Sequence, residues 1–88
     1  MNWLNTDFDT HLPRLKRIVV DADPNVLRNG IGDVTILVKD LDGNFVFCTR
    51  AIMRALMTVD VGDIDFPVWV RVRVKTTQTV KVKVWFYA

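Results

Sequence analysis

The chain has 88 residues, of which 50% are hydrophobic and 25% are charged, and its formal net charge is +2. A chain of this length builds one hydrophobic core, so we expect a single domain over residues 1–88, without the deep cleft that most metabolic enzymes use. The same balance of apolar and charged residues excludes an intrinsically disordered chain.

Membrane and secretory signals are absent from the sequence. No apolar run approaches the roughly 20 residues that a membrane-spanning helix needs. The amino terminus lacks the basic start and apolar stretch of a signal peptide. Cys48 is the only cysteine, so the chain cannot form an internal disulfide. We therefore expect synthesis in the cytoplasm and no membrane span.

The charged residues are unevenly distributed along the chain. All ten acidic residues are Asp and lie in residues 1–65 together with seven basic residues, whereas residues 66–88 carry five basic residues and no acidic one. Asp favours turns over helix interiors, which is typical of a β-rich fold. The opposed charges of the two parts favour a charged partner or a head-to-tail contact between subunits.

The first thirteen residues are compatible with two structures. Leu4, Phe8 and Leu12 recur every four residues, as on one face of a short helix that Pro13 would end. An apolar arm that docks on a neighbouring subunit fits the same residues.

Residues 14–20 end in the β-branched run Ile18-Val19-Val20, which predicts a buried strand. A long connection rich in turn residues follows, from Asp21 to Asp33. Connections of this length often carry contacts to partners.

Val34–Lys39 and Phe45–Thr49 form the clearest predicted hairpin, because Asp42-Gly43 between them supplies the positive φ angles of a two-residue type I′ turn. The predicted pairs are Ile36 with Thr49, Leu37 with Cys48 and Val38 with Phe47. Since Cys48 pairs with Leu37 inside the hairpin, we expect its thiol to be packed rather than reactive.

The apolar spacing changes from residue 50 to residue 59. Ile52, Met53, Leu56 and Val59 recur at helical intervals, and Gly62 could follow the end of a helix. The pattern predicts one short helix lying across a sheet.

Residues 66–88 contain two strict alternations around Thr76-Thr77-Gln78, which predict a long basic hairpin. The valines would share one face, and Val72 would face Val82. The opposite face would carry the candidate partner-binding residues Trp69, Arg71, Arg73, Lys75, Lys81, Lys83, Trp85 and Tyr87. In this register Arg71 faces Lys83 and Arg73 faces Lys81, which is mildly unfavourable, so the hairpin is either long enough to tolerate these pairs or has an anion to neutralise them. A plain solvated face is the alternative to a binding surface, because alternating valine and lysine is also typical of a half-buried hairpin.

Few residues are suited to catalysis or to metal binding. The chain has no Ser and a single His, so only threonine or Cys48 remains as a nucleophile, and a pair of Cys48 with His11 would need His11 to lie against the strand of Cys48. Asp21–Asn25 and Asp40–Asn44 alternate oxygen donors, but both lack the later glycine and acidic residue of a calcium loop. We therefore predict no enzymatic activity, no metal and no cofactor.

The expected fold is mostly β with one short helix, in the order β-β-β-α-β-β. It would form a small five-stranded antiparallel barrel or sandwich, and the strand order is compatible with an OB-like barrel. The order alone does not fix a function.

Three classes of function remain, none of which needs a small-molecule substrate or a membrane. The first is a structural or assembly subunit that forms a homo-oligomer or a larger particle, such as a virus or phage particle, and it is favoured by the apolar ends and the opposed charges. The second is a small nucleic-acid-binding protein that uses the basic, aromatic face of residues 69–87. The third is an inhibitor or adaptor of a host enzyme.

Overall fold

The computed structural model describes residues 3–23, 32–54 and 56–88. In these residues the chain forms antiparallel strands and no helix. The strands are β1 (Leu4–Leu12), β2 (Leu15–Ala22), β3 (Gly32–Asp40), β4 (Phe45–Ile52), β5 (Leu56–Ile64), β6 (Val68–Thr76) and β7 (Val82–Tyr87). The β-rich prediction is thus confirmed, whereas the predicted five strands and one helix are wrong.

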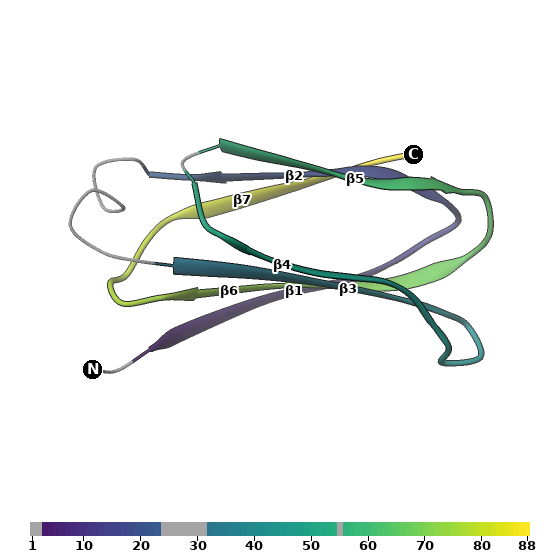
Figure 1. The fold of residues 1–88 in the computed structure, drawn as a ribbon, viewed down its shortest axis with the longest axis horizontal. Helices are drawn as coiled ribbons and strands as arrows, with labels where there is room; N and C mark the ends of the chain where they lie inside the picture. The colour runs from purple at the N-terminus through teal and green to yellow at the C-terminus, as the bar shows by residue number, and fades with distance from the viewer. Residues whose placement is uncertain (1–2, 24–31, 55) are drawn as a thin grey trace.

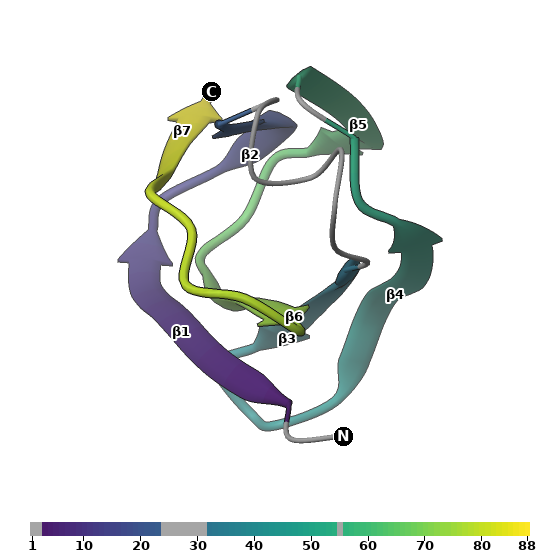
Figure 2. The same ribbon diagram turned by 90° about the vertical axis from the view of Figure 1, so that its left-hand side faces the viewer.

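The strands build two sheets that face each other (Figure 1). One sheet has four strands in the order β1-β6-β3-β4, and the other has three strands in the order β5-β2-β7. Viewed along the strands, β7 lies above β1 and β5 lies above β4 (Figure 2). The molecule is therefore an open sandwich, and the closed barrel with an OB-like strand order is not formed.

The strand pairs are nested in the sequence, with the first strand paired to the sixth and the innermost pair formed by neighbouring strands. β1 pairs with β6, β2 with β5, and β3 with β4, all antiparallel. This is the order produced when a long hairpin is rolled into two facing sheets, as in a jelly roll, here with three nested pairs and with β7 added beside β2.

The core lies between the two sheets and is lined by the alternate residues that point inward from each strand. Val68, Val70, Val72 and Val74 of β6 are almost completely enclosed, because β6 is flanked by β1 and β3 and covered by the second sheet. Full burial of each such side chain contributes about 1.5–3 kcal/mol. The opposing sheet supplies Leu15, Ile18, Val20, Ala22, Val61 and Ile64 to the same cluster.

The amino-terminal segment is a strand rather than a helix or a free arm. β1 pairs with β6 along its whole length, from Leu4 opposite Thr76 to Leu12 opposite Val68. Phe8 and Leu12 pack against the core. The four-residue spacing of the apolar side chains arises because residues four apart also share one face of a strand.

The predicted helix over residues 50–59 is wrong. Residues 50–52 end β4, and β5 begins at Leu56 in the opposite sheet. Met53 and Val59 belong to or pack against the core, whereas Ile52 and Leu56 occupy alternate positions that face outward, so the four residues only imitate a helical spacing. Ile52 and Leu56, which the helix would have buried, are among the most exposed apolar residues described.

The hairpin of β3 and β4 is confirmed, but its turn differs from the prediction. Ile36, Leu37 and Val38 pair with Thr49, Cys48 and Phe47. Gly43 has a φ of 85°, whereas Asp42 does not have a positive φ, so the turn is not type I′. A longer loop closes with Asp40 opposite Asn44, and a register shift beyond Val38 restores the predicted pairs.

The predicted hairpin over residues 66–88 is wrong. β6 and β7 belong to different sheets, and β7 pairs with β2, with Val84 opposite Val20. The valines of both strands do face the core, but they reach it from opposite sides. Val72 is fully buried as predicted, whereas Val82 is partly buried and packs against the core.

Two further sequence-based expectations concern the connection from Asp21 to Asp33 and membrane crossing. Residues 24–31 of the connection lie outside the described residues. Among the residues that are described, the structure contains no helix long and apolar enough to cross a membrane.

Candidate interaction surfaces

The structure divides the eight candidate partner-binding residues between two outer faces. Trp69, Arg71, Arg73 and Lys75 alternate with the buried valines on β6, so they point outward from the four-stranded sheet. Lys83, Trp85 and Tyr87 point outward from β7 in the other sheet, and Lys81 directly precedes that strand. The eight residues therefore do not form the single surface that the hairpin implied.

Two aspartates of β1 neutralise the arginines of β6. We call Asp7, Asp9, Arg71 and Arg73 the Asp–Arg ladder. Asp9 accepts two hydrogen bonds from Arg71, each 2.9 Å long, and Asp7 accepts two from Arg73 at 2.8 and 2.9 Å. In both pairs the residues sit directly opposite each other in the β1–β6 register. The opposed like charges predicted from the sequence are thus absent at these positions, because the strand beside β6 is acidic.

The ion pairs of the Asp–Arg ladder shift the pKa values of its four residues. The hydrogen bonds from Arg73 are the main cause that lowers the pKa of Asp7, and those from Arg71 lower the pKa of Asp9. The carboxylates in turn raise the pKa of Arg71 and Arg73. Bidentate pairs of this geometry are stronger and more directional than single ion pairs.

Aromatic rings lie over several cations of the four-stranded sheet. The Lys39 amine lies 5.0 Å from the Phe45 ring centroid and 5.8 Å from that of Trp69, and the Arg71 guanidinium lies 5.1 Å from the Trp69 centroid. Lys75 lies 5.3 Å from the ring of Trp3. Much of the positive charge on the four-stranded sheet is therefore already engaged within the chain.

Exposed apolar side chains lie at the two ends of β4. Four side chains there are between 65% and 76% exposed: Leu41, Phe45, Ile52 and Leu56. We call these four residues the apolar flank. Leu41 lies in the turn before β4, Phe45 and Ile52 are its first and last residues, and Leu56 begins β5, which lies on the same side of the sandwich (Figure 2). Large apolar side chains with this degree of exposure indicate a surface that a partner covers.

Cys48 lies on the outer face of β4 and is exposed, although it pairs with Leu37 as predicted. The prediction of a packed thiol is wrong because this face of the hairpin is turned to solvent. His11 belongs to β1 at the opposite edge of the same sheet, three strand spacings or about 14 Å away. The two residues therefore cannot act as a nucleophile and its base.

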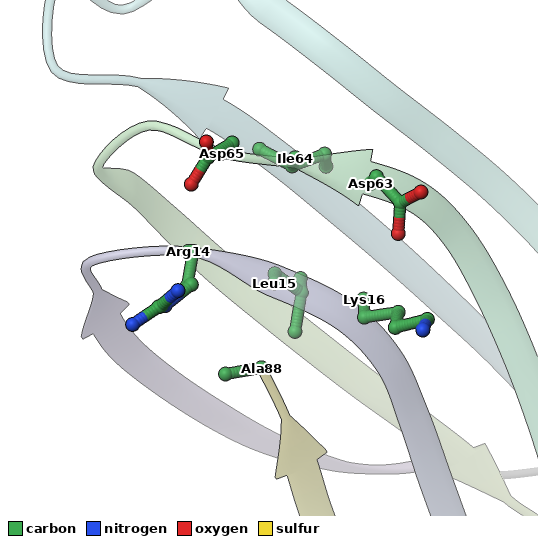
Figure 3. Close-up of a pocket in the computed structure, with 7 residues that line it drawn as sticks. All are labelled: Arg14, Leu15, Lys16, Asp63, Ile64, Asp65 and Ala88. Carbon is green, nitrogen blue, oxygen red and sulfur yellow. The ribbon is translucent and has the colours of Figure 1, made fainter.

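A hollow of about 300 Å³ lies at one end of the three-stranded sheet, between the start of β2 and the end of β5 (Figure 3). Arg14 and Lys16 flank buried Leu15, and Asp63 and Asp65 flank buried Ile64. None of the lining residues carries a hydroxyl, thiol or imidazole group.

A second hollow, of about 400 Å³, is lined by residues of β1, β3 and β6 and by the β3–β4 turn. Its one carboxylate, Asp40, accepts hydrogen bonds from the backbone of Asp42 and Asn44 within the turn, and these bonds lower its pKa. Among the described residues no group of three His, Cys or Asp side chains could hold a metal ion.

The apolar flank was missed by the sequence analysis, which assigned Ile52 and Leu56 to the buried face of a helix. The signal that could have found Ile52 is the register of the confirmed hairpin. Since Thr49 and Phe47 face inward, Cys48 and Arg50 face outward, and a strand that continues to residue 52 must expose Ile52 as well.

Comparison with known proteins identifies no family. No protein-family model matches the chain, and no curated protein matches it. Among solved structures, the chain is similar to one in the structure of infectious bursal disease virus Gx strain, with 14% identity, a TM-score of 0.44, and coverage of 98% of this chain and 25% of that one. A chain in the structure of the Gt strain is similar with 16% identity, a TM-score of 0.33 and coverage of 94% and 24%. The likeness is weak, and the chain spans about a quarter of the length of these solved chains.

Proposed function

We propose that this protein is a non-catalytic structural subunit that works by assembling with other protein subunits. The observation that carries the proposal is the apolar flank, whose four large side chains stay mostly in water in the isolated chain. Surfaces of this kind at the side of a small domain are covered in protein–protein contacts.

The sheet edges support the same proposal. Edge strands of stable monomers are protected by charges or by a short length. β1 carries Asp7 and Asp9, β5 carries Asp60 and Asp63, and β7 is short with Lys83 near its start. β4 has eight residues and one charge, Arg50, whose guanidinium is bonded to Asp33 of β3 at 2.7 Å. Asp7 and Asp9 of β1 are neutralised in the same way by Arg73 and Arg71, so β4 is distinguished among the edges of the described residues by carrying the fewest charges for its length.

The proposal extends to a component of a virus or phage particle. Jelly-roll winding recurs in viral capsid domains, and also in lectins and cupins, so the winding supports this proposal by analogy only. The nucleic-acid alternative is weakened by the Asp–Arg ladder, which occupies the two arginines on which it depended. An inhibitor or adaptor of a host enzyme would use the same apolar flank on a different protein.

The mass of the purified protein over a range of concentrations tests the proposal. We expect an oligomer, by light scattering or sedimentation, that Ile52→Lys dissociates because it places a charge in the apolar flank. Thr58→Lys adds the same charge at an exposed position of β5 in the other sheet and should leave the mass unchanged. A protein that stays monomeric at every concentration, with no particles in electron micrographs, would contradict the proposal.

A further inference from the structure

Resting on the proposed assembly function, we infer that the partner of β4 is the β4 strand of a second copy of this chain. The two strands pair antiparallel about a two-fold axis that passes through Thr49, and the two four-stranded sheets become one continuous sheet. The inference rests on the open hydrogen-bonding groups of β4, on the arrangement of the apolar flank about the middle of the strand, and on its charges.

The direction of the open backbone groups follows from one hydrogen bond. The backbone N–H of Met53 donates to the carbonyl oxygen of Gly32 in β3 at 2.8 Å. The backbone N–H and C=O groups alternate in direction along an antiparallel strand, so those of Ala51 and Thr49 also point toward β3. The N–H and C=O groups of Cys48, Arg50 and Ile52 therefore point toward the open edge, where another strand can bind them.

The apolar flank is suited to a second copy because its two ends match each other. Leu41 and Phe45 lie at one end of β4, and Ile52 and Leu56 lie at the other. A two-fold axis at the middle of the strand brings each end against the opposite end of the second copy. An isologous contact needs such a self-complementary surface, since the same residues face each other twice.

The charges of β4 agree with a second copy. Arg50 is the one charged residue of the strand, and its own chain neutralises it through Asp33. The edge therefore presents little charge for an oppositely charged partner to complement.

Three alignments of the two β4 strands keep their open hydrogen-bonding groups opposite each other near the middle of the strand. The residues that each alignment places opposite each other decide between them. An axis at Arg50 would place two arginines face to face, which is unfavourable. An axis at Cys48 would place Ile52 opposite the polar Asn44 of the loop. An axis at Thr49 places Arg50 opposite Cys48 of the second copy and brings Ile52 to the end of the partner strand that carries exposed Phe45. The last alignment is the one we infer.

Two substitutions at one position test the edge pairing. Arg50→Pro removes an N–H that points toward the open edge, and proline is tolerated at such edge positions. Arg50→Ala also loses the ion pair with Asp33 but keeps the N–H, so it is the matched control. We expect Arg50→Pro to raise the dissociation constant of the dimer about tenfold or more and Arg50→Ala to change it little.

Cys48 reports the geometry directly. In the inferred register the two Cys48 residues are diagonal neighbours on one face, with Cα atoms about 7–8 Å apart. A short bis-maleimide should therefore link two wild-type chains efficiently. In a Cys48→Ala background, Thr58→Cys places the reporter on the outer face of the other sheet, where no covalent dimer should form.

The outcomes separate the inference from the proposed function. Covalent dimers through Cys48 that are lost in Arg50→Pro support the inference. An oligomer that persists in Arg50→Pro, and is linked through residue 58 but not through Cys48, overturns the inference and leaves the assembly function intact. A monomer under all conditions overturns both. If Arg50→Pro fails to fold, Ile52→Lys replaces it, and persistence of the Cys48 link in that variant overturns the inference.

Discussion

Val72 lies at the centre of β6, opposite Phe8 on one side and Ile36 on the other, and is fully buried. Val72→Ala should lower the free energy of unfolding by about 2 kcal/mol, from lost transfer energy and a residual cavity. Val82→Ala removes the same atoms from a partly buried position and should cost less. Urea unfolding of both variants measures the difference. Equal costs would contradict the assignment of Val72 to the centre of the core.

Val72→Asp is the more severe form of the same test, because it would bury a carboxylate with no partner. A small domain of marginal stability should not fold with that charge in its core. An unchanged melting temperature would show that the inward face of β6 is wrongly assigned.

Asp7 and Asp9 make the stability of the protein depend on pH. The pKa of each carboxyl is lowered in the folded state by its arginine. The stabilisation is therefore present above the unfolded pKa of about 3.9 and is lost as the pH falls through the lower folded pKa. We expect the melting temperature to fall more steeply below about pH 4 in the wild type than in the Asp7→Asn/Asp9→Asn double variant.

The comparison between these two proteins isolates the ladder. Asp40, whose pKa is also lowered, remains in both and contributes equally. Thermal unfolding followed by circular dichroism from pH 6 to pH 2 gives the two curves. Parallel curves would mean that the Asp–Arg pairs do not stabilise the folded chain.

At the scale of the elements, the turn between β3 and β4 depends on Gly43. Its φ of 85° lies in the left-handed region, and a Cβ added there would meet no atom within 4 Å. Gly43→Ala should therefore destabilise through backbone strain alone, by about 1–2 kcal/mol. Gly43→Asn should cost less, because asparagine tolerates this conformation. Chemical unfolding ranks the two, and an equal or reversed order would contradict a left-handed residue 43.

Local pattern was sufficient to predict some elements and insufficient for others. The β3–β4 hairpin could be predicted with its register, because a short turn places neighbouring strands together. β1 could not, since a spacing of four residues fits one face of a helix and one face of a strand. The segment from residue 50 to residue 59 imitated a helix because outward-facing Ile52 and Leu56 of two strands fall at helical intervals from Met53 and Val59, which lie in or against the core.

In the last third of the chain, the alternation of apolar and basic residues determines which side chains face the core. It correctly predicted that Val70, Val72 and Val74 face the core and that Arg71 and Arg73 do not. It could not identify the neighbouring strand, because pairing between segments distant in sequence leaves no local signal. The carboxylates that neutralise the two arginines lie more than sixty residues earlier, in β1.

For the candidate site, the sequence identified the outward face of β6 but not the apolar flank. The flank depends on β4 being an edge strand, which follows from the sheet order and not from the residues of β4 alone. Likewise, the exposure of Cys48 depends on which face of the hairpin the second sheet covers.

At the scale of the whole molecule, the nested pairing of the strands places acidic residues of the first part of the chain beside basic residues of the last third. The basic last third does not form a separate surface, because β6 is inserted between β1 and β3 and meets the two aspartates of β1. The field that would attract a phosphate backbone is thereby reduced at Arg71 and Arg73.

Nucleic-acid binding tests this account. We expect the wild type to show negligible affinity for a labelled single-stranded oligonucleotide at about 0.15 M salt. The Asp7→Asn/Asp9→Asn variant should bind measurably, because two guanidinium groups are released. The logarithm of its affinity should fall with the logarithm of salt concentration with a slope of about −1.4, the value for two phosphate contacts on a single strand.

Asp63→Asn/Asp65→Asn is the matched control, because it changes the net charge by the same amount at the end of β5 in the other sheet. Fluorescence anisotropy at several salt concentrations gives the affinities and slopes of all three proteins. If only general charge mattered, both double variants would gain affinity equally, and the ladder would have no special role. Tight binding by the wild type with a slope near −3, as for four phosphate contacts, would instead show that phosphate displaces the aspartates, and nucleic acid would replace protein as the favoured partner.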